Sequence, residues 1–239
     1  MPLPQIATPT YELVLPSTGK KIKYRPFLVR EEKILIMALE TEDMKQITDA
    51  VLTILNGCIM TKGVKIEDLP SFDIEYLFLN VRAKSVGEKV EVNLTCPDDN
   101  VTSVTIDIDL DSIKVKKDKN HKKIVKLDDN LSLKLKYPTM DTFINNNFES
   151  NDDADIKTTL KLITTCIDII YNEEESWTGS DSTEKELIEF VEQLNTKQFQ
   201  LIENFFSTMP KLTHSVKIKN PKTNVESTVI LEGLASFFN

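Results

Sequence analysis

Two stretches of the sequence resemble each other: Val92-Asn-Leu-Thr-Cys-Pro-Asp-Asp-Asn-Val-Thr-Ser-Val-Thr-Ile-Asp-Ile-Asp-Leu110 and Val216-Lys-Ile-Lys-Asn-Pro-Lys-Thr-Asn-Val-Glu-Ser-Thr-Val-Ile-Leu-Glu-Gly-Leu234. They align without gaps, and each has the pattern of a strand, a polar turn containing proline and a second strand. The shared residues include Val92/Val216, Pro97/Pro221, Asn100/Asn224, Val101/Val225, Ser103/Ser227 and Leu110/Leu234. A genuine repeat predicts two related helix-plus-hairpin halves. Two unrelated hairpins are the alternative, because any hairpin turn recruits proline and asparagine.

Periodicity predicts helices and short strands around these hairpins. A first hairpin pairs residues 11–15 with 21–24 across the turn formers of 16–20. Apolar residues at helical spacing predict helices, and alternating apolar residues predict strands. The expected helices cover about 29–38, 43–60, 156–170, 183–193 and 197–208, and a further helix starts at an N-cap of either Asp68 or Ser71 and stops at Gly87. The remaining expected strands are 90–95, 103–110, 124–127, 131–137, 215–219 and 227–231. Trp177 is expected in an acidic loop, and Met37, Met44 and Met60 are expected to pack in the core.

These elements predict an α+β fold in which helices pack with short antiparallel β-hairpins. The polar and acidic segment 145–155 is expected to be a linker. It divides the chain into an N-terminal half, residues 1–147, and a C-terminal half, residues 148–239, which could also form one compact unit.

Charge and composition argue against several classes of protein. The chain has 29 basic and 38 acidic residues, a formal net charge of -9, whereas nucleic-acid binding needs a clustered basic face. The lysines between Lys114 and Lys123 are interrupted by polar residues and are expected to form a solvated loop. We expect neither a signal peptide nor a membrane span. Three widely spaced cysteines indicate reduced thiols in a cytoplasm.

Residues that could support catalysis are scarce. His121 and His214 are the two histidines, and no glycine-rich phosphate loop is present in the sequence. Cys96-Pro-Asp-Asp99 resembles one half of a zinc knuckle, but aspartate replaces the second thiol. The corresponding turn, Asn220-Pro-Lys-Thr223, has no thiol at all. We therefore expect no catalytic residue, no cofactor and no metal.

Terminal and turn residues indicate protein partners instead. Pro4, Ile6 and Pro9 lie in an extended N-terminal segment that could follow a neighbouring protein or fray. Phe237 and Phe238 near the C-terminus could anchor an interface or pack on the chain's own hairpin. Pro97 and Pro221, in the two repeated turns, complete the set of candidate partner-binding residues.

Five stretches together resemble T4-like bacteriophage baseplate hub and hub assembly proteins. They are Leu3–Leu13, Leu15–Phe27, Val29–Leu35, Arg82–Glu88 and Leu231–Phe238, and they touch both ends and the middle of the chain. The resemblance implies a role at the centre of a contractile tail's baseplate, as a minor subunit or an assembly factor. The implied partners are other hub proteins, with self-association as a further option.

The same resemblance implies a location in the host cytoplasm during assembly, or in the virion tail. Some relatives carry Cys-x-x-Cys at the hairpin turns, and this chain departs from that pattern at Asp99, Asn220 and Thr223. The family offers no catalytic residues to transfer. Two alternatives stay open: a transient hub-assembly chaperone absent from the virion, and a nucleic-acid-binding phage regulator that uses the lysine loop.

Overall fold

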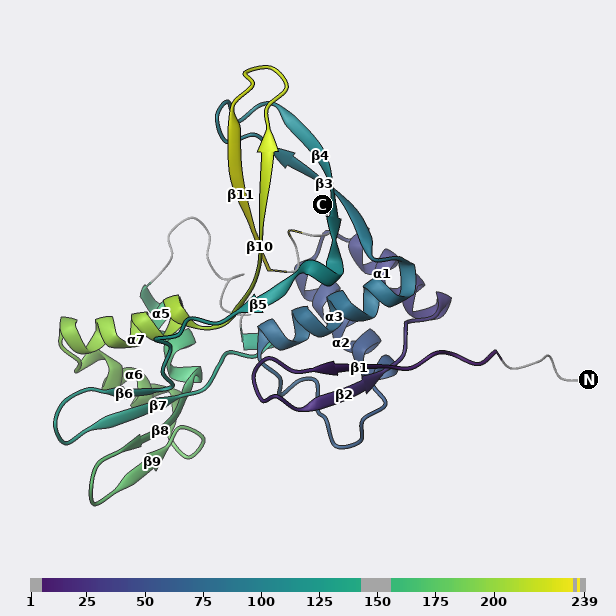
Figure 1. Cartoon of the computed structure of the whole chain (residues 1–239). Coiled ribbons are helices and arrows are strands. Elements are labelled where there is room, and N and C mark those ends of the chain that lie inside the picture. Colours follow the sequence, from purple (N-terminus) through teal and green to yellow (C-terminus); the bar gives the residue numbers. More distant parts are fainter. Residues whose placement is uncertain (1–5, 143–155, 234–235, 237–239) are drawn as a thin grey trace, which may run out of the picture. The chain divides into compact units, whose positions relative to one another are not determined.

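The computed structural model describes residues 6–142, 156–233 and 236, and has the expected α+β fold of helices and small antiparallel sheets (Figure 1). Contacts divide the chain into two compact units: unit 1 takes Met1–Ile66, Phe72–Lys116 and Lys211–Asn239, and unit 2 takes Glu67–Ser71 and Lys117–Pro210. This division differs from the halves expected from sequence, because the last hairpin groups with the first unit. Within the described ranges, no helix is long and apolar enough to cross a membrane.

Unit 1 begins with the predicted hairpin and three helices. Strands β1 (Tyr11–Val14) and β2 (Lys21–Tyr24) pair antiparallel, and α1 (Val29–Leu39), α2 (Met44–Cys58) and α3 (Ser71–Val86) follow. The α3 side chains Ile74, Leu77, Phe78 and Val81 are fully buried. A helix that is apolar on several sides is buried on several sides, so α3 is the central helix of unit 1.

A buried ion pair fixes where α1 starts. The Arg25 guanidinium donates to Glu31 Oε1 at 2.9 Å and to the Gly57 carbonyl near the end of α2 at 2.8 Å. Glu31 Oε2 accepts from the Leu28 backbone N–H at 2.7 Å, which caps the first turn of α1. One pair of side chains thus ties the end of β2 to both helices.

Two hairpins complete unit 1 around one core. They are formed by β3 (Lys89–Thr95) with β4 (Ser103–Asp109), and by β10 (Lys211–Lys219) with β11 (Glu226–Glu232). β5 (Lys114–Lys116), a strand not predicted from sequence, pairs with β10. Their shared core contains Leu79, Ala83, Val92, Leu94, Cys96, Ile108, Leu110, Ile113, Leu212, Ile218 and Leu231.

The registers of the two hairpins correct the gap-free alignment. Thr95 pairs with Ser103 in the first hairpin, whereas Lys219 pairs with Glu226 in the second, so the second turn is one residue shorter. The first strands, β3 and β10, correspond residue by residue as in the gap-free alignment. The second strands, β4 and β11, correspond only after β11 is shifted by one residue. That shift matches buried Ile108 with buried Leu231, and a slip of one residue would turn each strand's apolar face outward.

Unit 2 packs helices with a four-stranded antiparallel sheet of order β6-β7-β8-β9. The strands are β6 (Ile124–Lys126), β7 (Ser132–Leu135), β8 (Ile167–Tyr171) and β9 (Ser176–Thr178), and the helices are α5 (Ile156–Thr165), α6 (Glu184–Glu192) and α7 (Thr196–Thr208). Their core includes Leu133, Leu135, Ile163, Ile167, Ile202 and Phe205.

The expected helix over 156–170 is wrong beyond Thr165. Residues 167–171 form β8, and Trp177, expected in a loop, lies in β9 and pairs with Ile170. A register irregularity at Lys134 and Leu135 interrupts the β7–β8 ladder. As a result Ile167 and Ile170 are both buried, and their spacing of three imitates a helix.

The expectation that three methionines pack in the core is also wrong. Met37 is 61% exposed and Met60 54% exposed, and Met44 is exposed too. On α1 the core takes Leu35 and Ala38, which lie on the other side of the helix from Met37. The spacing of apolar residues predicts this helix. Because the helix has apolar residues on more than one face, the spacing does not indicate which face packs against the core.

Glu31→Gln is expected to weaken unit 1 at neutral pH and to flatten its acid dependence. Burial alone would raise the pKa of Glu31, but hydrogen bonds from Arg25, Arg30 and the Leu28 N–H outweigh it and hold the pKa at about 2. A carboxyl whose pKa is lowered by folding stabilises the protein above its unfolded pKa, and the gain is lost as the pH falls from about 4.5 to about 2. The expected loss is on the order of 3 kcal/mol.

The measurement is urea unfolding followed by far-UV circular dichroism at pH 7 and pH 3. Glu32→Gln, at the next position of α1, is the matched control and should behave like the parent protein. Equal acid sensitivity of the parent and Glu31→Gln would contradict this account.

Candidate functional site

The turns of the two long hairpins have closely similar backbones. The Asn100 N–H donates to the Cys96 carbonyl at 2.9 Å, and the Asn224 N–H donates to the Asn220 carbonyl at 2.9 Å. Asn100 and Asn224 both adopt positive φ, 53° and 61°, a left-handed conformation that asparagine tolerates better than most residues. The repeated asparagines therefore have a shared conformational role in the two turns.

Side chains join the two turns directly. The Asn220 amide donates to both carboxylate oxygens of Asp98, at 3.1 and 3.0 Å, and to Asp99 Oδ2 at 3.0 Å. The Thr223 hydroxyl also donates to Asp98. Figure 1 shows the β3–β4 and β10–β11 turns side by side. We refer to Asp98, Asp99, Asn220 and Thr223 as the turn clasp.

Asn220 is the centre of the turn clasp because its side-chain amide forms hydrogen bonds within its own turn and to the other turn. The residue is 1% exposed. Its amide oxygen accepts from the backbone N–H of Lys222 at 2.8 Å and so holds its own turn. Its amide nitrogen meanwhile holds the other turn, so a single buried amide shapes one turn and attaches it to its neighbour.

The hydrogen bonds keep both carboxylates of the turn clasp ionised. Donation from Thr223 and Asn220 lowers the pKa of Asp98. The pKa of Asp99 is lowered mainly by the hydroxyl and backbone N–H of Thr102 and further by Asn220. Two adjacent carboxylates that each accept several hydrogen bonds need not share a proton at neutral pH.

Cys96 stands beside the turn clasp as a neutral thiol. Burial raises its pKa, and the charges of Asp98 and Asp99 raise it further. A thiol rather than a thiolate is a poor nucleophile and a poor metal ligand. In the part of the chain that the structure describes, no group of three or more histidine, cysteine or acidic side chains is arranged to hold a metal ion.

The joined turns expose apolar side chains. Val101 is 76% exposed and Val225 is 46% exposed, and each directly follows the asparagine of its turn. Pro97 and Pro221, two of the residues expected to bind partners, are exposed on the same turns. Two turns held by several hydrogen bonds can present this apolar surface with little loss of conformational entropy on binding.

The remaining candidate partner residues lie apart from the turn clasp. Ile6 is 92% exposed and Pro9 is exposed, both in the segment that precedes β1. Pro4, Phe237 and Phe238 lie outside the described residues.

The two histidines lie in different units. His121 lies in unit 2, where it stacks on Tyr137 and contacts Phe205, with ring centroids 5.5 and 5.1 Å apart. Its Nδ1 is 3.0 Å from Thr208 Oγ1, and burial lowers its pKa. His214 lies in β10 of unit 1. The packing of His121 indicates a structural role.

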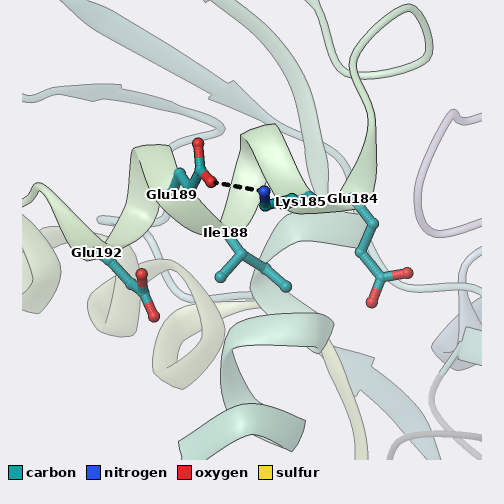
Figure 2. Close-up of a pocket in the computed structure, with 5 residues that line it drawn as sticks. All are labelled: Glu184, Lys185, Ile188, Glu189 and Glu192. Atoms are coloured by element: carbon teal, nitrogen blue, oxygen red, sulfur yellow. Dashed lines mark ion pairs between the residues drawn. The ribbon is translucent and has the colours of Figure 1, made fainter.

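A shallow hollow of about 470 Å³ lies along α6. Figure 2 shows the side chains of five residues that line it. Glu184, Lys185, Ile188, Glu189 and Glu192 line it, and Lys185 forms an ion pair with Glu189 at 3.6 Å. Among the described residues, all five come from a single helix, α6. Its pattern is that of a solvated amphipathic helix.

The sequence pointed to the turns but not to the turn clasp. The repeated proline, asparagine and valine mark both turns, whereas no pattern in the sequence indicates that Asp98 and Asp99 bind the other turn. Asn220 occupies the place that Cys96 holds in the first turn, and both are buried. That correspondence was the available signal that Asn220 points inward.

A family model described as "T4 bacteriophage base plate protein" matches residues 8–239. No curated protein and no solved structure matches the chain.

Asn220→Ala is expected to separate the two turns. The change removes the donor to Asp98 and Asp99 and the acceptor for the Lys222 N–H, while the rest of unit 1 stays folded. Amide hydrogen exchange in the two turns should accelerate roughly tenfold or more, because hydrogen bonds to charged groups are the stronger ones. Lys222→Ala, in the same turn, is the matched control.

Asn220→Asp sharpens this test. It keeps the size of the side chain but puts a third carboxylate against two others, so exchange should be at least as fast as in Asn220→Ala. Unchanged exchange in both variants would show that the turn clasp does not hold the turns together.

Proposed function

Because the chain belongs to the T4 bacteriophage base plate protein family, we propose that it serves the baseplate hub, as a hub subunit or a hub assembly factor. The match over residues 8–239 carries the proposal, since it includes both units and both long hairpins. Membership makes this a phage baseplate protein. Family membership does not by itself specify the hub or a contractile tail, and it does not distinguish a subunit from an assembly factor. Those roles are what we propose.

The proposed mode of action is protein–protein contact. The main contact surface is formed by the turns of the β3–β4 and β10–β11 hairpins, which we call the paired turns. Val101 and Val225 expose apolar surface there, and the turn clasp holds the two turns in one arrangement. Interfaces favour apolar side chains on a preorganised backbone because less entropy is lost on binding. The proposed partners are other baseplate hub proteins.

The proposal includes no catalytic step. Burial raises the pKa values of Cys58, to about 11, and of Cys166, to about 12, so neither thiol is activated at neutral pH. His121 is engaged in aromatic packing. These features support a protein that acts through its surfaces.

The first expected result concerns virions. Quantitative mass spectrometry of gradient-purified virions and of tail intermediates from one infection should detect the chain in baseplate intermediates. A fixed copy number in virions as well would identify a hub subunit, and its loss from virions would identify an assembly factor or transient chaperone. Absence from both kinds of particle would refute the proposal and favour a nucleic-acid-binding regulator.

The second expected result concerns the paired turns. A phage carrying Val101→Asp and Val225→Asp should accumulate incomplete tails, because two charges would have to be desolvated in the contact. Val14→Asp is the matched control, since Val14 is also an exposed valine of unit 1, on β1. Electron microscopy of lysates, with circular dichroism of the purified variants to verify folding, makes the measurement. Normal tails with the double variant would exclude the turns as the essential contact.

A further inference from the structure

Helix α1 has a second apolar face that points away from the core. Its buried residues, Leu35 and Ala38, define the inner side. With 3.6 residues per turn, Val29, Ile36 and Met37 fall on the opposite side. Val29 is 80% exposed and Ile36 51% exposed, so this outer stripe stands in water along most of an 11-residue helix.

Two opposite charges lie on the same stripe. Lys33 is one turn before Met37 and Glu40 is one turn after Ile36, and both are exposed. Among the described residues, neither side chain has an ion-pair partner within the chain. The stripe is therefore apolar in the middle, basic toward the start of α1 and acidic toward its end.

We propose that this stripe binds the same stripe of a second copy of the chain, with the two α1 helices antiparallel. A two-fold axis between Ile36 and Met37 places Ile36 of one copy opposite Met37 of the other. The same operation places each Lys33 opposite the Glu40 of the other copy.

Charge complementarity selects the antiparallel arrangement. A parallel pair would set Lys33 against Lys33 and Glu40 against Glu40, which is repulsive. The antiparallel pair forms two ion pairs by symmetry and also opposes the two helix dipoles. A two-fold contact is self-complementary, so each stripe must suit itself, and this stripe does so in both charge and apolar pattern.

The size of the contact sets its strength. An 11-residue helix is about 16 Å long, so the buried area falls at the small end of specific interfaces. We expect a weak, concentration-dependent dimer. This inference concerns α1 alone and does not depend on the proposed hub function or on the paired turns.

Charge reversal tests the pairing most sharply. Sedimentation equilibrium of the full chain over a range of concentrations should show a monomer–dimer equilibrium. Lys33→Glu and Glu40→Lys should each weaken dimerisation roughly tenfold, because each reversal replaces two ion pairs by two repulsions. The double variant Lys33→Glu/Glu40→Lys should restore it, since the exchanged charges again face each other. Lys21→Glu, on β2, is the control for net charge.

Cross-linking tests the position of the axis. A Met37→Cys variant should form an intermolecular disulfide quickly under mild oxidation, because the residue lies beside the axis, whereas Lys20→Cys in the β1–β2 turn should not. The native Cys58, Cys96 and Cys166 are buried. A chain that stays monomeric at all concentrations would overturn the proposal, even if the stripe bound an unlike baseplate protein. So would a dimer whose stability ignores both charge reversals.

Discussion

A two-stranded hairpin on its own is at best marginally stable in water, and unit 1 contains two long ones. Each therefore depends on the other and on α3. The hairpins share an apolar core with Leu79 and Ala83 of α3, and β10 gains a third strand in β5. At the turns, where little core remains, Asn220 replaces apolar contact with hydrogen bonds to Asp98 and Asp99. The turns are therefore paired because the two hairpins stabilise each other along their length.

Much of the fold was predictable because its signals are local. The β1–β2 hairpin follows from the turn residues before Lys21, and α7 follows from Asn195, whose side chain caps the helix as its residue type suggests. The failures came where a distant partner decides the outcome. An irregular ladder with β7 made Ile167 and Ile170 of β8 imitate a helix. Similarly, the outward position of Met37 on α1 depends on which face of the helix packs against the rest of unit 1, and the local sequence does not indicate that face.

The candidate site was predictable in its parts and not in its assembly. Repetition marked both turns, but Asp98 and Asn220 are 122 positions apart, and no local pattern indicates that they touch. The second strands also shift by one residue relative to the gap-free alignment, because burial of Ile108 and Leu231 outweighs the identity of Ser103 and Ser227. In this pair of hairpins, register follows packing rather than matching letters.

The division of the chain into units also has a consequence for its synthesis. Nearly all of unit 2 is one continuous stretch, residues 117–210, inserted between β5 and β10 of unit 1. At about 5–20 residues per second, β3 and β4 leave the ribosome roughly ten seconds before β11 does. During that interval the partner that completes their core does not yet exist. The paired turns can therefore form only on a chain whose translation has passed Glu232, so incomplete chains lack this surface.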